Sequence, residues 1–165
     1  SVILCSVVPR MSSVVVRAAV VRDIGGFDES LTYGEDWDLW LRLSRRYPGV
    51  YVRRPTTRYR LHSTSLSGTG TARTERYYRA NVLVLEKHQA LSPSLAVRRA
   101  LGRARAALAQ TLLAAGRRHA ARAAARHGLL TWPTPLAVRT LAEATAPGAY
   151  RALSAAVRRG SRATR

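Results

Sequence analysis

The chain changes character near residue 72, and this change limits the folds that it can adopt. Before this point, short runs of β-branched residues alternate with turns rich in glycine and proline, a pattern typical of mixed α/β structure. After it, alanine, leucine and arginine recur at helical spacing, and the breaks fall at prolines and glycines. The sequence therefore predicts an α/β part over residues 1–67 and a mostly α-helical extension over residues 68–165.

Local patterns predict the individual elements. Runs of β-branched residues predict strands at residues 1–8, 12–17, 50–54 and 56–62. Helices are expected between these strands, at residues 18–24 and 35–47. In the second part we expect a helix at residues 72–90, a long Ala/Arg/Leu stretch from Ser92 to about His127, and two shorter helices opened by prolines near residues 135 and 147.

The net charge of +19 at pH 7 is concentrated in the second part. Residues 61–165 hold 18 basic and three acidic side chains, whereas residues 1–60 hold ten basic and six acidic ones. Basic helices can contact an anionic membrane surface, bind nucleic acid, or simply expose arginine while alanine and leucine pack. Because the aromatic residues are not interleaved with basic ones in a recognised motif, no specific nucleic acid is expected as a partner.

The cysteine content and the length of the apolar runs indicate a cellular location. Cys5 is the single cysteine, so neither an internal disulfide nor a cysteine metal cluster is expected. Arginines interrupt every apolar run that approaches the length of a membrane-spanning helix. A cytoplasmic setting is expected, with peripheral contact at the inner face of the plasma membrane through the basic helices as a further option. Residues 2–4 already resemble a strand, which indicates a piece that begins inside a domain.

Five of the nine carboxylates lie between Asp28 and Asp38, within eleven residues. Local helix chemistry accounts for several of them. Thr32 followed by Glu35 matches a capping box, and acids in a first turn favour the positive end of the helix dipole. Asp38 and Arg42 are four residues apart, so we expect an exposed ion pair between them.

Asp36 is harder to explain as a helix-capping acid. At helical spacing it shares a face with Trp40, Leu43 and Tyr47, and this face is the apolar one. A carboxylate on such a face is costly when it is buried without a partner, but it is tolerated where the helix begins at a cleft. The pattern leaves two interpretations open, a general base and a structural acid.

Three segments in order carry a family resemblance: "VVVRAAVVRDIGGFDESL", "EDWDLWLRL" and "YRLHSTSLS". Together, over about residues 9–67, they strongly resemble the second half of the catalytic domain of family 2 glycosyltransferases, which are inverting GT-A enzymes. The resemblance implies the C-terminal, acceptor-side portion of a Rossmann-like α/β domain. It implies transfer of a sugar from a nucleotide-sugar donor to a hydroxyl of a saccharide or lipid-linked acceptor, in cell-surface polysaccharide or glycolipid synthesis.

The resemblance also implies roles for residues on the acceptor side. It places the catalytic base at Asp36, with Glu35 beside it. In the "GGFDE" loop, Asp28 and Glu29 would accept hydrogen bonds from sugar hydroxyls, and Trp37 would lie beside the acceptor. A carboxylate base suits this chemistry because the acceptor hydroxyl must lose its proton as the new bond forms.

On the donor side, the resemblance places Arg60 and His62 near the diphosphate, with His62 as a potential metal ligand. The alternative for His62 is a surface histidine at a strand end. Mg²⁺ or Mn²⁺ is expected in the complete enzyme. Asp36-Trp37-Asp38 has the form of the metal-binding D-x-D motif, but it opens a helix where the base is expected. The main metal ligands are therefore expected outside this chain, which would lack the donor-binding half and be inactive alone.

One function of a different class stays open. The chain could be a non-catalytic basic helical module that binds a membrane surface or nucleic acid and carries a degenerate glycosyltransferase segment. A strand-rich segment of about 100 residues encoded upstream, ending in a hydrophobic run and a D-x-D triplet, would distinguish the enzyme from this module.

Overall fold

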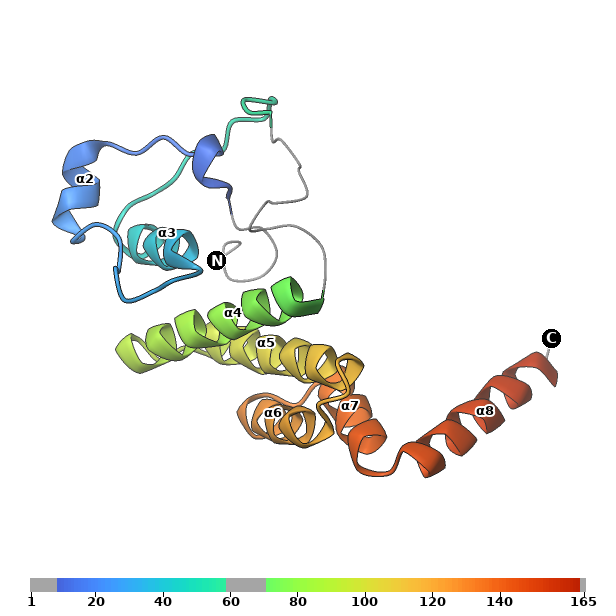
Figure 1. The fold of residues 1–165 in the computed structure, drawn as a ribbon. Coiled ribbons are helices and arrows are strands. Elements are labelled where there is room, and N and C mark those ends of the chain that lie inside the picture. Colours follow the sequence, from blue (N-terminus) through green and yellow to red (C-terminus); the bar gives the residue numbers. More distant parts are fainter. Residues whose placement is uncertain (1–8, 59–70, 164–165) are drawn as a thin grey trace. The chain divides into compact units, whose positions relative to one another are not determined.

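The computed structural model describes the backbone of residues 9–58 and 71–163, and the side chains of residues 9–58 and 72–155. Its elements are, in order, η1 (Met11–Ser13), α2 (Ala18–Asp23), α3 (Glu35–Arg46), α4 (Thr71–Leu91), α5 (Leu95–Ala114), α6 (Arg118–Thr131), α7 (Pro135–Thr145) and α8 (Pro147–Ala163) (Figure 1). They belong to two compact units, Ser1–Ala100 and Leu101–Arg165. The helices predicted from the sequence are confirmed with small shifts at their ends, except that the long stretch predicted from Ser92 to about His127 forms two helices, α5 and α6.

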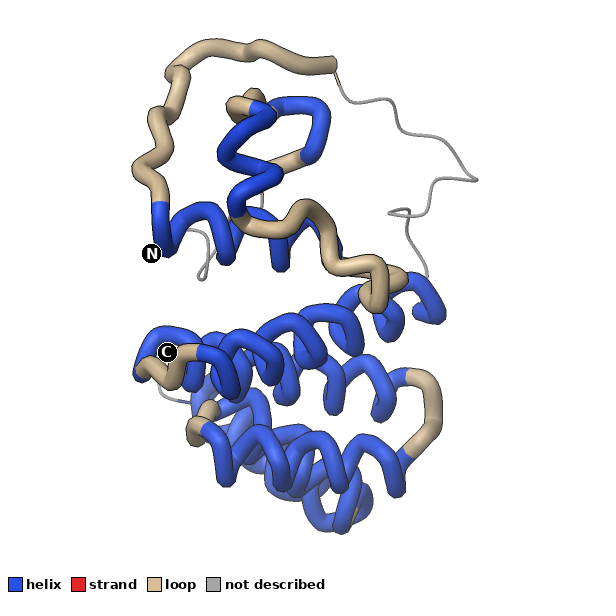
Figure 2. The backbone as a smooth tube through the Cα atoms, turned by 90° about the vertical axis from the view of Figure 1, so that its left-hand side faces the viewer, coloured by secondary structure: helices blue, strands red, loops and turns tan. Residues whose placement is uncertain are grey.

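The prediction of an α/β, Rossmann-like fold is wrong for the described residues, which contain helices and loops but no strand (Figure 2). The segment at residues 12–17 shows the physical reason. Val14 and Val16 pack against α3, while Val15 is 100% exposed, so the alternation typical of a strand is present. A strand also needs a hydrogen-bonded neighbour, and no described segment supplies one.

The remaining strand predictions are either wrong or fall outside the described residues. Residues 50–54 and 56–58 are irregular, so the strand predictions there are wrong. The strand predicted at residues 1–8, and the remainder of the one predicted at 56–62, lie outside the described residues.

Helix α3 supplies one buried apolar cluster of the first unit. Its buried cluster consists of Leu39, Trp40 and Leu43. Val20 and Ile24, from α2 and the turn after it, pack against this cluster together with Tyr47. Trp40 also donates its indole N–H to the Pro9 carbonyl at 3.1 Å, which ties the segment before η1 to the helix. The apolar stripe predicted through Trp40 and Tyr47 is therefore confirmed.

The predicted capping box at the start of α3 is wrong. The N-cap residue is Gly34, in the left-handed region with φ of 78°, so the helix has no hydrogen bond from an N-cap side chain. This backbone conformation strongly favours glycine. Space is limited as well, because a Cβ atom on Gly34 would lie 3.2 Å from Cγ2 of Val84 in α4. Close approach of α3 to α4 thus sets the start of the helix, and Thr32 has no part in it.

The second unit is built on small residues. The long helical stretch predicted to reach His127 is divided at Gly116, whose φ of 76° reverses the chain between α5 and α6. Fully buried alanines occur in both helices, at positions 106, 109, 121 and 125. The closest approach is at Gly102, where a Cβ atom would lie 2.5 Å from the Trp132 Cβ and 2.8 Å from the Trp132 carbonyl oxygen. The hairpin therefore depends on the absence of side chains at its contact.

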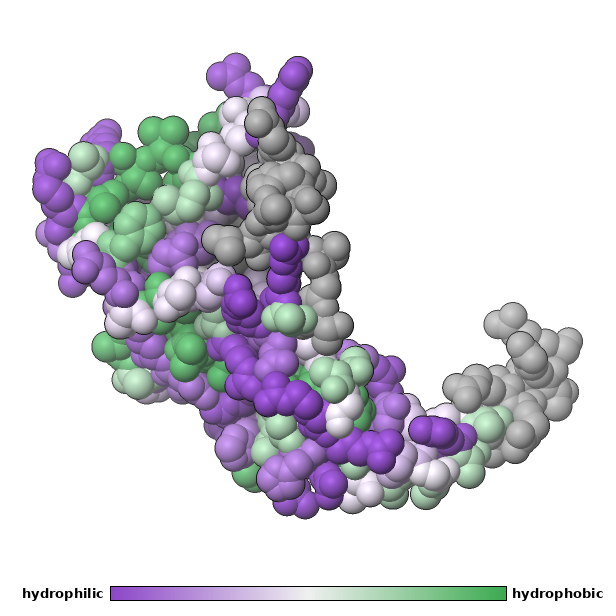
Figure 3. Space-filling view, in the orientation of Figure 1, coloured by the Kyte–Doolittle hydropathy of each residue, from purple (hydrophilic) through white to green (hydrophobic). Residues whose placement is uncertain are grey.

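Some large apolar side chains remain at the surface of the first unit. Figure 3 shows green hydrophobic surface over the region of α2 and α3. Val50 and Tyr51, in the irregular segment after α3, are 93% and 84% exposed. Single exposed apolar residues are common in folded proteins, so these positions alone do not identify a binding surface.

We predict that Gly102→Ala destabilises the second unit whereas Gly148→Ala does not. Alanine is the better helix former by about 1 kcal/mol, but the clash with Trp132 should reverse that gain and cost about 1–3 kcal/mol net. Gly148 is the matched control, because it lies in α8 and a Cβ there meets nothing within 4 Å. Urea denaturation followed by circular dichroism measures both variants. Equal effects of the two substitutions would contradict the packing described here.

Candidate active site

The acids at the start of α3 have different surroundings. Asp38 is fully buried, at 0% exposure, whereas Glu35 and Asp36 are half-buried. The predicted Asp38–Arg42 pair forms, with Arg42 Nε 2.8 Å from Asp38 Oδ2, but the expectation that it is exposed is wrong. A buried carboxylate persists only where hydrogen bonds and opposite charges compensate its lost hydration.

Three side chains compensate Asp38. Besides Arg42, Lys87 Nζ lies 2.8 Å and His88 Nε2 lies 2.9 Å from Asp38 Oδ1, and both residues belong to α4. Burial raises the pKa of Asp38, but the hydrogen bonds from His88, Lys87 and Arg42 outweigh it and hold that pKa well below its ordinary value. Asp38 is therefore ionised at neutral pH. We call these four residues the Asp38 cluster.

Arg42 extends the Asp38 cluster to the turn after α2. Its Nη1 donates to the Ile24 carbonyl at 2.7 Å and its Nη2 donates to the Gly26 carbonyl at 2.6 Å. Gly25 and Gly26 have φ of 80° and 68°, which lets the chain reverse at the end of α2. The glycine pair of the "GGFDE" motif thus forms a turn whose carbonyls are bound by an arginine from α3.

Lys87 extends the Asp38 cluster to the loop beyond that turn. Its Nζ lies 2.7 Å from Asp28 Oδ2, while Asp28 Oδ1 accepts the Ser30 N–H at 3.0 Å and the Ser30 hydroxyl at 2.6 Å. The bonds from Lys87 and then Ser30 lower the pKa of Asp28 from 3.8 to about 2. Burial lowers the pKa of Lys87, but Asp28 and Asp38 outweigh it and raise that pKa above 10.5.

His88 is the most enclosed member of the cluster, at 0% exposure. Because the Asp38 carboxylate accepts, the Nε2–H of His88 donates, and its Nδ1 has no hydrogen-bond partner among the described residues. The His88 carbonyl in turn accepts from Arg45 Nη2 at 3.3 Å. His88 therefore attaches α4 to α3 at two points.

Asp36 has none of the partners that hold Asp38. Its Oδ1 accepts the Trp37 N–H at 2.7 Å in the first turn of the helix. Across residues 9–58 and 72–155, no cationic side chain forms an ion pair with Asp36. Two acids in one helical turn are thus placed differently: Asp38 is fully engaged inside the protein, and Asp36 keeps a half-buried carboxylate with one helix contact.

The remaining predicted acceptor residues are spread over loop and core. Glu29 is exposed and lies next to Asp28, which the Lys87 bond holds in place. Trp37 is only 7% exposed, so it offers an acceptor little surface. On the donor side, Arg60 and His62 lie outside the described residues, and their predicted roles stay predictions.

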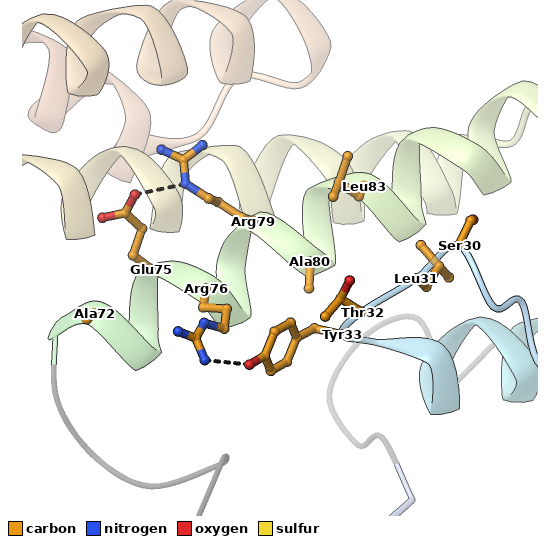
Figure 4. Close-up of a pocket in the computed structure, with 10 residues that line it drawn as sticks. All are labelled: Ser30, Leu31, Thr32, Tyr33, Ala72, Glu75, Arg76, Arg79, Ala80 and Leu83. Carbon is orange, nitrogen blue, oxygen red and sulfur yellow. Dashed lines mark hydrogen bonds and ion pairs between the residues drawn. The ribbon is translucent and has the colours of Figure 1, made fainter.

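A groove of about 440 Å³ runs between the loop at residues 30–33 and α4. Figure 4 shows Tyr33 directed at Arg76, which donates to the Tyr33 hydroxyl. The Arg76 guanidinium also lies 4.9 Å from the Tyr33 ring centroid, a cation–π arrangement. Arg79 Nε pairs with Glu75 at 2.8 Å on the same helix. The groove therefore begins where the Asp28 loop ends, and it combines apolar walls with arginine at its rim.

The described residues do not assemble a metal site. No group of three or more histidine, cysteine, aspartate or glutamate side chains in this part of the chain is close enough to hold a metal ion. In the triplet Asp36-Trp37-Asp38 the second carboxylate is already bound by three side chains. This engagement supports the sequence interpretation that the triplet is not the D-x-D metal motif.

Sequence reasoning missed Lys87 and His88. Their contacts with Asp38 join residues about fifty positions apart in the sequence, and no local sequence pattern predicts such a contact. One signal was present, because Lys87 is the single lysine among 28 lysine and arginine residues. A lysine that binds two carboxylates differs in role from arginines that face solvent.

We predict that Lys87→Met lowers the free energy of unfolding by about 1.5–3 kcal/mol at pH 7, the usual size for hydrogen bonds to charged groups. The loss should depend on pH. The contribution of Asp28, whose folded pKa is lowered to about 2, is present above its ordinary value of 3.8 and lost as the pH falls towards 2. The contribution of Lys87, whose pKa is raised, is present below 10.5 and lost as the pH rises through the folded value.

Urea denaturation at several pH values measures this difference. The gap between the natural chain and Lys87→Met should be widest from about pH 5 to 10 and should narrow at both extremes. Arg46→Gln, which breaks the exposed pair with Asp23, is the control and should cost no more than about 0.5 kcal/mol. A gap that stays constant from pH 2 to 11 would rule out the ionic contacts as its cause.

Comparison with known proteins identifies a protein family that this chain matches. Residues 1–91 match the family described as glycosyltransferase like family 2, and this match covers more than half of the 165 residues. The match ends at the last residue of α4, so it includes the whole Asp38 cluster. The chain has no significant match among curated proteins or among solved structures. The match over residues 1–91 shows that this chain belongs to the glycosyltransferase-like family 2.

Proposed function

We propose that this chain takes part in inverting transfer of a sugar from a nucleotide-sugar donor to a hydroxyl acceptor, with Asp36 as the general base. Membership of the family supplies the class of reaction. Inversion, the nucleotide-sugar donor and the saccharide or lipid-linked acceptor are parts of the proposal. Synthesis of a cell-surface polysaccharide or glycolipid on the cytoplasmic side of the membrane is the setting that we propose.

The contrast between Asp36 and Asp38 is the observation that supports this proposal most strongly. A general base must reach the proton of the acceptor and must be free to take it up. Asp38 meets neither requirement, because it is fully buried and bound by three side chains. Asp36 is half-buried and is bound by one amide of its own helix. Among the acids of this helix turn, Asp36 is therefore better suited than Asp38 to act as the base.

The proposed step is a single displacement. The acceptor oxygen attacks the anomeric carbon, and the bond from that carbon to the nucleoside diphosphate breaks, so that the leaving group takes the electron pair. Asp36 receives the hydroxyl proton as the new bond forms. Glu35, beside it and half-buried, supports the negative field that favours proton transfer.

Asp28 and Glu29 are proposed to bind acceptor hydroxyls. Asp28 is ionised at neutral pH, since its pKa is about 2, so it can only accept hydrogen bonds. Its bond to Lys87 fixes the carboxylate, which favours recognition of a hydroxyl at a defined position. Glu29 is exposed on the same loop and has more freedom to follow the acceptor.

Mg²⁺ or Mn²⁺ is the cofactor that we propose, and it would neutralise charge on the departing diphosphate. The described residues do not form a site for it, so no step of the proposal passes through a metal. His62 and Arg60 are the residues of this chain that we propose for the donor side.

We predict that Asp36→Asn in the full-length enzyme lowers kcat by about 10²–10⁴-fold, because the amide cannot take up the proton. Donor affinity, measured by equilibrium binding of the nucleotide sugar, should change little. Asp23→Asn is the matched control, since Asp23 lies at the exposed end of α2 and binds Tyr47 and Arg46. It should keep kcat within about twofold of the natural enzyme. Loss of donor binding with kcat preserved would instead assign Asp36 to the donor side and overturn the proposed role.

A further inference from the structure

The groove between the loop at residues 30–33 and α4 has a lining that the transfer chemistry does not use. Its volume of about 440 Å³ is that of a small-molecule site. Its apolar walls are formed by Leu31 from the loop and by Ala80 and Leu83 from α4. Leu83 is 57% exposed although it belongs to a regular helix. The groove therefore offers a bound molecule an apolar surface made by two elements of the first unit.

Arg76 places a positive charge at one end of this groove. Its guanidinium donates to the Tyr33 hydroxyl and lies 4.9 Å from the Tyr33 ring centroid, so two contacts hold it in position. Arg79 is paired with Glu75 at 2.8 Å, whereas no carboxylate in the described part of the chain forms an ion pair with Arg76. Arg76 is thus an exposed, positioned guanidinium whose further N–H groups can bind an anion.

The groove is continuous with the loop that carries the proposed acceptor residues. Figure 4 shows Ser30 at one end of the lining and the bonded pair of Tyr33 and Arg76 at the other. Ser30 binds Asp28 through its N–H and its hydroxyl. Tyr33 precedes Asp36 by three residues, so their Cα atoms are at most about 11 Å apart. An acceptor whose hydroxyl lies beside Asp36 can therefore extend into the groove.

We infer that the groove binds a lipid-linked acceptor, with Arg76 bonded to the phosphate of the lipid and with Leu31 and Leu83 contacting the adjoining hydrocarbon. In the part of the chain that the structure describes, no helix is long and apolar enough to span a membrane. The lipid contact that we infer is the groove alone. The role of the bound lipid as acceptor rests on the proposed function, whereas its binding does not require transfer.

Saccharides without a lipid suit this lining less well. Sugar hydroxyls placed against Leu31, Ala80 and Leu83 would lose hydration without gaining hydrogen-bond partners. An acidic saccharide would neutralise Arg76 but would meet the same apolar walls, and a neutral one would also leave Arg76 without a counter-charge. A phosphate joined to hydrocarbon matches both the cation and the apolar surface.

Isothermal titration calorimetry of the full chain with decyl phosphate, below its micelle concentration, tests this inference. Inorganic phosphate and glucuronate supply negative charge without the alkyl chain, and each should bind at least about tenfold more weakly than decyl phosphate. Arg76→Gln should weaken binding of decyl phosphate by about 10- to 100-fold, because hydrogen bonds between charged groups are lost. Leu83→Gln should weaken it by about fivefold, because apolar contact is lost without a change in charge.

A charge-matched control separates the groove from net charge. Arg46→Gln removes another exposed charge from the first unit, one that pairs with Asp23 outside the groove, and should change the affinity by less than about twofold. Circular dichroism checks that each variant keeps its helical content.

Several results would overturn the inference. They are the absence of decyl phosphate binding, equal losses in Arg46→Gln and Arg76→Gln, and an unchanged affinity in Leu83→Gln. Glucuronate binding as tightly as decyl phosphate would assign the groove to an acidic saccharide and would overturn it as well. Because the titration contains no donor and measures no transfer, its result is independent of the kinetic test of Asp36.

Discussion

The first unit depends on one buried negative charge. Asp38 has no exposure to water, and a carboxylate in that position is stable only if the protein supplies cations and donors around it. Arg42, Lys87 and His88 meet this requirement, and each of them also attaches another part of the chain. Arg42 binds the glycine turn after α2, Lys87 binds the Asp28 loop, and His88 attaches α4 to α3. The loop that carries the proposed acceptor residues is thereby fixed against two helices.

The helices were predictable because each has a local signal. Prolines open α7 and α8, glycines follow the end of α2, and periodic apolar residues define α3. The absence of strands from the described residues was not predictable, because runs of β-branched residues indicate only an extended, half-buried chain. Val14 and Val16 meet that description by packing on a helix. Pairing is a nonlocal property, and a strand exists only when a second segment donates and accepts hydrogen bonds along it.

The candidate site was predictable only in part, for a related reason. The resemblance pointed to Asp36 and the "GGFDE" loop, and helical spacing correctly joined Asp38 to Arg42. The exposure of that pair was wrong because burial depends on α4, whose Lys87 lies 49 positions beyond Asp38 in the sequence. Spacing along one helix assigned Asp36 to the apolar side, yet the contact with α4 is what encloses Asp38. Distinguishing an accessible acid from an engaged one therefore required tertiary structure.

The central claim is that two acids in the first turn of α3 have different roles. Asp38 stabilises the fold, whereas Asp36 is available to act as the general base. The most direct test is the free energy of unfolding of Asp38→Asn beside that of Asp36→Asn, from urea denaturation at pH 7. The account predicts a loss of about 3–5 kcal/mol for Asp38→Asn, because the buried cations lose their counter-charge. It predicts a loss below about 1 kcal/mol for Asp36→Asn. Equal losses, or a larger one for Asp36→Asn, would contradict the account.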